Sequence, residues 1–218
     1  MYILSFSTPL EKIEDGIIYV TVPENFPEEA RNIIESAVKH SFKRYRFEGK
    51  RAKYEVICQV FTDSNGDKAI LIPYYLIPGR KYPIYVYIYA IELYCSNPKI
   101  SQRKAAEETK KRFNLEKFSH TTVGRAFKAL EKSIAQETRP AQSGGAANPA
   151  QTECDGAQPS ADAPQGRMFP SIRDTYARRE KMAAFLKDMC EGDGAADIIE
   201  KCRRIVGKWY GKHRRLLI

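Results

Sequence analysis

The sequence predicts an α+β protein built from four successive parts. Apolar residues alternate with polar ones over much of residues 1–82, recur at helical spacing after Pro83, and are nearly absent from a later stretch rich in Ala, Gly, Pro, Gln and Ser. We therefore expect four parts along the chain: a small α+β region with a β-hairpin (1–82), a helix-turn-helix (83–134), a disordered linker (135–167) and a basic helical hairpin (168–218).

Two short strands and a helix are expected first. Tyr2–Phe6 and the β-branched run Gly16–Val22, which stops at Pro23, are typical of strands. A helix should start within Asn25–Glu29, where a proline and two acids suit a first turn. Its expected apolar face comprises Ala30, Ile33, Ile34, Ala37 and Val38.

A β-hairpin should follow. Ala52–Phe61 alternates in the manner of a half-buried strand, and Lys68–Ile72 is the returning strand. Between them Asn65 and Gly66 form a dipeptide that tolerates the positive φ angles of a tight hairpin turn. The buried face of the first strand is expected to carry Tyr54, Val56, Cys58 and Val60.

Three helices are expected in the next segment. The first, Pro83–Cys95, is apolar on most faces and should be buried at the centre, and Asn97 and Pro98 end it. The second begins at Ser101, a good N-cap, and runs to Phe113. Its inner stripe is expected to be Ala105, Ala106, Thr109 and Phe113, with Ile100 and Leu115 closing the two ends.

The third helix has the features of a DNA-recognition helix. Ser119 is its natural N-cap, and Phe118 precedes it as a hydrophobic staple. Helical spacing buries Phe118, Val123, Phe127 and Leu130 and leaves His120, Thr121, Thr122, Arg125 and Lys128 exposed. In a helix-turn-helix, such N-terminal residues meet base edges in the major groove while the preceding helix holds phosphates.

The exposed residues fit these two tasks. Thr121 and Thr122 are short enough to enter the groove, and Arg125 can reach a guanine with two hydrogen bonds. The cations expected on the phosphate backbone are Arg103, Lys104, Lys110, Lys111 and Arg112. The predicted DNA-binding set joins these five to Ser119, His120, Thr121, Thr122, Arg125 and Lys128.

Positive charge is concentrated on the same segment. The chain carries a formal net charge of +9, and residues 96–132 contain 10 Lys/Arg but only 4 Asp/Glu. This favours sequence-selective binding of double-stranded DNA by a mobile-element accessory protein or a transcriptional regulator. A solvated basic face in a purely structural domain is the alternative. Ala106 and Val123 lie further apart than in the compact form of the motif, so its docking details do not transfer.

One family resemblance supports this interpretation. The run Ile70–Pro83, the helix after it, and Ile100–Glu107 resemble transposon-associated zinc-ribbon plus helix-turn-helix proteins of Gram-positive bacteria. The resemblance covers roughly residues 38–132 and implies a zinc ribbon followed by a transposase-like helix-turn-helix. In that family the hairpin carries Cys-x-x-Cys knuckles, whereas the corresponding hairpin of this chain contains only one cysteine, Cys58. We therefore expect the zinc ligands to be absent.

Catalytic and metal chemistry are not expected. The five cysteines and three histidines contain no Cys-x-x-Cys pair, so neither a metal nor another cofactor is predicted. No catalytic residues are predicted either, because Asp174, Asp188, Asp193 and Asp197 suit helix caps and solvated faces better than a two-metal site. The odd cysteine count and the lack of a signal peptide favour a cytoplasmic protein. The longest apolar run, around Tyr82–Cys95, is too short to cross a bilayer, so no membrane partner is expected.

Ser171–Cys190 and Ala195–Tyr210 are expected to form two C-terminal helices. The second has an apolar stripe of Ile198, Ile199, Cys202, Ile205, Val206 and Trp209. Because a two-helix hairpin is too small to be stable alone, it should pack on the preceding domain, self-associate as a homodimer, or fold against a partner.

Two other functions stay open at this point. The chain could be a protein-interaction module that recruits a transposase, a recombinase or another subunit through its C-terminal helices. It could also bind RNA, with Tyr74, Tyr75 and Tyr82 as candidate stacking platforms on a strand, although a place in the core is the favoured interpretation of these tyrosines.

Overall fold

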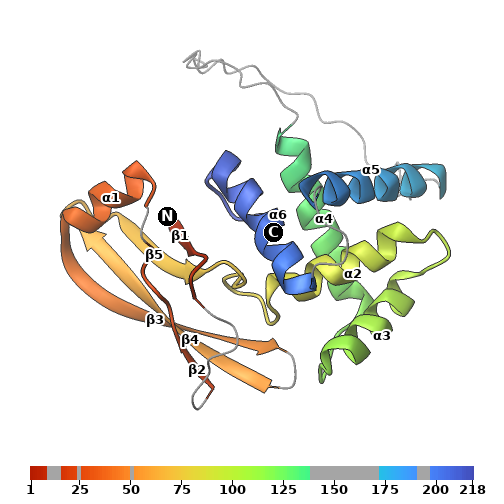
Figure 1. The fold of residues 1–218 in the computed structure, drawn as a ribbon, viewed down its shortest axis with the longest axis horizontal. Coiled ribbons are helices and arrows are strands. Elements are labelled where there is room, and N and C mark those ends of the chain that lie inside the picture. The colour runs from red at the N-terminus through yellow and green to blue at the C-terminus, as the bar shows by residue number, and fades with distance from the viewer. Residues whose placement is uncertain (9–15, 24–25, 50–51, 138–171, 191–196) are drawn as a thin grey trace, which may run out of the picture.

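The computed structural model describes residues 1–8, 16–23, 26–49, 52–137, 172–190 and 197–218. These residues form the expected α+β fold, with a five-stranded sheet and six helices. The sheet lies on one side of the molecule and helices α2 to α6 lie on the other (Figure 1). Residues 138–167, most of the predicted linker, lie outside the described residues.

Strand β4 (Ala52–Asp63) is the centre of the sheet. Strand β3 (Ala37–Gly49) pairs with it antiparallel along almost its whole length. On the other side of β4, strand β2 (Ile17–Tyr19) runs parallel to its first half and β5 (Lys68–Pro73) antiparallel to its second half. Strand β1 (Tyr2–Ser5) is parallel to β5. The predicted hairpin is therefore confirmed as β4–β5, and Gly66 has the positive φ of 87° that its turn requires.

Strand β3 corrects one prediction. Helix α1 (Glu28–Glu35) ends before the expected positions Ala37 and Val38, which belong to the strand instead. Periodicity missed β3 because most of its side chains are exposed, so it lacks the apolar alternation of β4. The β3 strand is stabilised by its pairing with β4. Because β4 is a different segment of the chain, the sequence of β3 alone does not reveal this pairing.

Helix α2 (Ile84–Ser96) is the buried centre of the helical part, as predicted. Nine of its 13 residues are buried. It contacts α3 (Gln102–Phe113), α4 (His120–Glu137), α5 (Ile172–Cys190) and α6 (Ile198–His213). Helix α4 thus runs three residues beyond the predicted domain boundary at 134.

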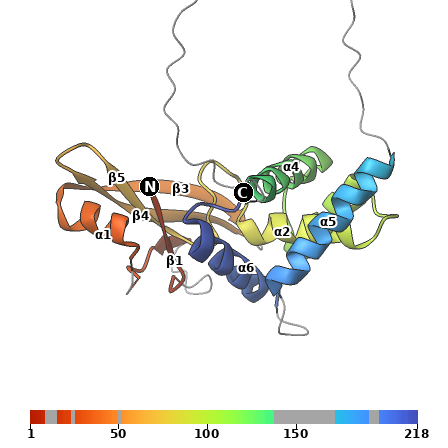
Figure 2. The ribbon, with the colours of Figure 1, turned by 90° about the horizontal axis from the view of Figure 1, so that it is seen from above.

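The C-terminal helices pack on the preceding domain, one of the three arrangements considered. Both views place α6 between the sheet and α5 (Figures 1 and 2). The Tyr210 hydroxyl donates to the main-chain oxygen of Tyr2 in β1 over 2.9 Å, and Lys201 forms an ion pair with Glu92 of α2. The apolar stripe of α6 is accordingly buried inside this chain at Cys202, Ile205, Val206 and Trp209.

Arg179 of α5 connects this helix to the C-terminal end of α2. Its side chain is only 6% exposed, and it donates hydrogen bonds to main-chain oxygens at and beyond the end of α2, those of Tyr94, Asn97, Pro98 and Ile100. The last carbonyl groups of a helix have no donors within it, and they carry partial negative charge. The buried guanidinium supplies both the donors and the opposite charge.

Candidate nucleic-acid interface

Helix α3 begins and ends with local caps that its sequence specifies. The Ser101 hydroxyl accepts a hydrogen bond from the backbone N–H of Lys104 over 3.2 Å, so the predicted N-cap is confirmed. At the other end Asn114 adopts a left-handed conformation with φ 49°, and Leu115 N–H donates to the Lys110 carbonyl. The predicted inner stripe is buried at all four positions, Ala105, Ala106, Thr109 and Phe113.

The turn between α3 and α4 is anchored to the sheet. It spans residues 114–119, and its apolar side chains Leu115 and Phe118 are buried. Glu48, at the end of β3, accepts a hydrogen bond from the backbone N–H of Glu116 over 2.5 Å. The same carboxylate lies 2.8 Å from the Lys81 ammonium. The turn that sets the start of α4 is therefore held by a carboxylate from another part of the fold.

The protonation of Glu48 reflects this environment. Burial alone would raise its pKa, but the hydrogen bonds from Lys81 and from the backbone of Glu116 outweigh burial, and the pKa lies below its usual value. Glu48 is therefore a charged anchor at neutral pH. Sequence reasoning missed it, since a single Glu at a strand end carries no local signal.

The first turn of α4 is closed by a hydroxyl cluster. Ser119 is the N-cap, accepting from the backbone N–H of Thr122, and its hydroxyl lies 2.8 Å from that of Thr121 and 3.0 Å from that of Thr122. Thr122 is half-buried, whereas Thr121 and His120 are exposed. Of the predicted groove residues at this end, Ser119, His120 and Thr121 are thus exposed, and the hydroxyl groups of Ser119 and Thr122 also order the helix start.

One face of α4 forms a continuous exposed stripe, which we call the α4 stripe. It consists of Thr121, Arg125, Lys128 and Lys132, whose spacing places them on one line along the helix. The opposite face is buried at the predicted positions Val123, Phe127 and Leu130 and also at Ala126 and Ile134. Lys132 was not predicted as a site residue, although its helical spacing from Arg125 and Lys128 contains the signal.

The side chain of Gln102 on α3 packs over Gly124 of α4. A Cβ atom at Gly124 would lie 3.0 Å from the Gln102 side-chain oxygen, so the absence of a side chain at Gly124 leaves room for this contact.

The five predicted cations of α3 are all exposed, but they do not share one face. Arg112 follows Arg103 by nine residues, which is about half a turn out of phase on an α-helix. Lys104 and Lys111 point most directly away from the buried stripe, and Lys111 lies 3.7 Å from Glu108. The helix can thus present only part of this set to one DNA backbone at a time.

Helix α5 adds cations that sequence reasoning did not place here. A hollow of about 440 Å³ lies between α4 and α5, lined by Lys128, Lys132, Arg178 and Lys181 among others. Arg178 pairs with Glu131, the one acid among α4 residues 120–136, and this pairing raises the pKa of the guanidinium. Arg178 and Lys181, which are far from α4 in the sequence, therefore extend the basic surface beside the α4 stripe.

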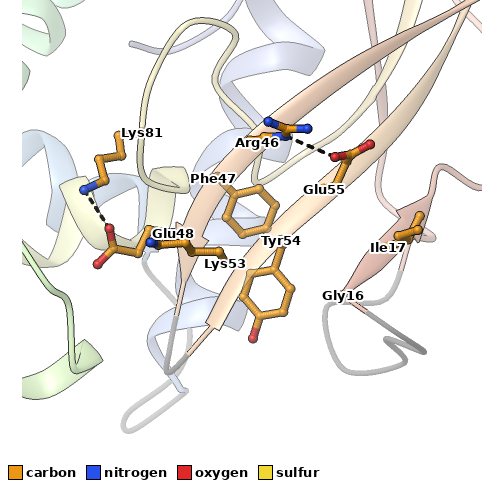
Figure 3. A pocket seen from close by; sticks show the side chains of 9 residues that line it. All are labelled: Gly16, Ile17, Arg46, Phe47, Glu48, Lys53, Tyr54, Glu55 and Lys81. Carbon is orange, nitrogen blue, oxygen red and sulfur yellow. Dashed lines mark hydrogen bonds and ion pairs between the residues drawn. The ribbon is translucent and has the colours of Figure 1, made fainter.

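A second hollow, of about 460 Å³, lies at the end of the β3–β4 pair. Figure 3 shows the two ion pairs at its rim, Lys81 with Glu48 and Arg46 with Glu55, around the rings of Phe47 and Tyr54. This hollow therefore adjoins Glu48, the residue that anchors the α3–α4 turn.

The three tyrosines considered as RNA-stacking platforms lie in the core, which is the interpretation that the sequence favoured. Tyr74, Tyr75 and Tyr82 are 6%, 0% and 5% exposed, so their rings cannot meet a base. They pack in the core, where Tyr75 contacts Phe47 and Tyr74 stacks on Phe6.

Among the described residues, no three His, Cys, Asp or Glu side chains lie close enough together to hold a metal ion. Within the same residues, no helix has the length and apolar character needed to cross a membrane. The four cysteines that the structure describes are free thiols.

No protein-family model matches this chain, and neither a curated protein nor a solved structure shows significant similarity to it.

Proposed function

We propose that this protein binds double-stranded DNA with sequence selectivity, placing α4 in the major groove and α3 against the phosphate backbone. The observation that carries the proposal is the α4 stripe, an exposed line of Thr121, Arg125, Lys128 and Lys132 with no acid on it. The nearest acid of α4, Glu131, is already neutralised by Arg178.

Position along α4 suggests a role for each stripe residue. Arg125 lies one turn inside the helix and can donate two hydrogen bonds to a guanine, next to the short side chain of Thr121. Lys128 and Lys132 lie further from the N-terminus, where a helix leaves the groove and meets phosphates. Lys104 and Lys111 of α3 face outward and would hold the backbone on the other side.

The biological setting is part of the same proposal. A DNA-binding protein without predicted catalytic residues fits a mobile-element accessory factor or a transcriptional regulator in the cytoplasm. The recruitment of a transposase or recombinase is the weaker alternative, because α5 and α6 direct their main apolar faces onto α2 and each other.

Selection from random duplexes, followed by binding titrations of the full chain, tests the proposal. We expect a selected duplex to bind more tightly than a scrambled one, and both affinities to fall steeply between about 50 and 200 mM salt. Failure to enrich any sequence, together with binding that does not respond to salt, would contradict it.

Two substitutions divide the roles of the helices. Arg125→Ala should lower affinity for the selected duplex about tenfold while changing the scrambled duplex little. Lys111→Ala should weaken both duplexes alike, by a smaller factor. Lys208→Ala, at an exposed position on α6, is the matched control and should change neither. Equal effects of the first two substitutions on discrimination would refute the assignment of α4 as the recognition helix.

A further inference from the structure

One face of the sheet exposes aromatic and basic side chains together. Cross-strand pairing puts Tyr19 of β2 and Arg44 of β3 beside Ile57 of β4, and Phe42 of β3 beside Gln59. Directly paired residues point to the same side of a sheet, so these side chains and Arg46 share one surface. We call this surface the outer face.

The exposure of the outer face is unlike that of the opposite face. Tyr19 and Phe42 are each 69% exposed, whereas Ile18, Val56 and Cys58 on the opposite face are buried. Covering either ring would remove apolar area from water, which is favourable. Strand spacing places the Cα atoms of Tyr19 and Phe42 roughly 12 Å apart, far enough for each ring to hold a separate base.

The charges of the outer face suit a phosphate backbone. The guanidinium groups of Arg44 and Arg46 lie 3.3 Å and 3.1 Å from the carboxylate of Glu55, so one acid is shared between two cations. Both arginines are more than 70% exposed, and exposed ion pairs of this kind exchange readily for other partners. An unbalanced positive charge therefore remains next to the two rings.

One end of the outer face contacts the turn before α4. Glu48 and Lys53 occupy the next positions on this side of β3 and β4, and both contact Glu116 in that turn.

We propose that the outer face binds single-stranded DNA, with bases stacked on Phe42 and Tyr19 and the backbone held by Arg44 and Arg46. Aromatic rings beside arginines are the chemistry that single-stranded nucleic acid requires, because every base offers a π-face and every linkage a negative charge. The choice of DNA rather than RNA rests on the proposed duplex-DNA function of α3 and α4.

Binding of labelled oligonucleotides by the full chain tests this proposal. The probes are an oligothymidylate of about 15 nucleotides, the matching oligouridylate, a blunt duplex, and the same duplex with a thymidine tail. We expect Phe42→Ala to weaken oligothymidylate binding about tenfold and to remove the extra affinity that the tail gives, while blunt-duplex binding stays unchanged. Phe42→Tyr should retain binding, and Tyr176→Ala, at an exposed ring on α5, is the control.

The possible outcomes separate this proposal from the duplex-binding proposal. Weaker binding of a blunt selected duplex by Arg125→Ala, with intact oligothymidylate binding, would show two independent surfaces. Tighter binding of oligouridylate through Phe42 would overturn the assignment to DNA. A wild-type dimer that becomes a monomer in Phe42→Ala, without any oligonucleotide binding, would show that a second copy of this chain covers the face and would overturn the proposal.

Discussion

The α4 stripe and the outer face of the sheet both expose cations beside groups that can touch bases, yet they are assembled in different ways. All four residues of the α4 stripe come from one helix, at spacings that the helix itself aligns. The outer face takes Tyr19, Phe42 and Ile57 from three strands, and only strand pairing brings them together. Local periodicity therefore reveals the first surface and conceals the second.

The two parts of the molecule also differ in how they are held. The helical part surrounds α2 and depends on the C-terminal helices, including the buried cation Arg179. The β3–β4 pair depends on its long ladder and contacts the helical part at the ion-paired anchor Glu48. The following predictions test whether the two parts respond separately.

Deletion of residues 168–218 should have the largest effect. It uncovers α2 and removes fully buried side chains, including Trp209, Ile205 and Met182, so we expect a loss on the order of 5 kcal/mol or more. Hydrogen exchange followed by mass spectrometry should show α2 losing protection far more than β3 and β4. Equal loss in both parts would show that they unfold as one unit. If the wild type is an oligomer and the deletion leaves a stable, folded monomer, the interaction-module hypothesis would be favoured instead.

Arg179→Met should destabilise the helical part by about 3 kcal/mol, because several carbonyl groups lose their donor. Urea unfolding followed by circular dichroism measures this change. Arg173→Met, at an exposed position on the same helix, is the control and should have little effect. A similar, small effect of both substitutions would refute the capping role of Arg179.

Glu48→Gln should cost about 1–2 kcal/mol and loosen the turn before α4. The folded pKa of Glu48 lies below its ordinary value of 4.5, so the unfolded chain takes up this proton first as pH falls. The contribution is therefore complete above about pH 4.5 and is lost as pH drops through the lower, folded pKa.

Unfolding curves between neutral pH and acid measure this difference between wild type and variant. We expect the difference in stability to shrink in acid, with Glu180→Gln on the surface of α5 as the control. A difference that stays constant down to acid pH would exclude a charged anchor.

Thiol labelling should give the smallest and most local signal. Burial raises the pKa of both Cys58 in the sheet and Cys95 in α2 to about 12, and it raises that of Cys202 as well. In a Cys154→Ser background, the half-buried Cys190 should react first with a thiol reagent at neutral pH. The slower rates at Cys58 and Cys95 then report the opening of the sheet part and of the helical part. Rapid labelling of Cys58 would show that the core beneath the outer face opens more readily than the full burial of Cys58 indicates.

The sequence alone was sufficient for elements with a strong local signal. It predicted the hairpin at Gly66, the caps at Ser101 and Ser119 and the buried faces of α3 and α4. Turn residues, capping residues and helical periodicity can all be recognised from positions close together in the sequence. The sequence alone failed at β3, because alternation cannot mark an edge strand whose side chains are mostly exposed.

For this chain, sequence determined the α+β class, the three helices α2 to α4 and the cations on α4. Tertiary structure decided which further residues join them: Glu48 at the turn before α4, Arg178 and Lys181 beside the α4 stripe, and Phe42 next to Tyr19 on the sheet. The reason is physical. A helix aligns its residues through hydrogen bonds within one segment, whereas strand pairing and buried ion pairs join distant segments and appear only when the chain has folded.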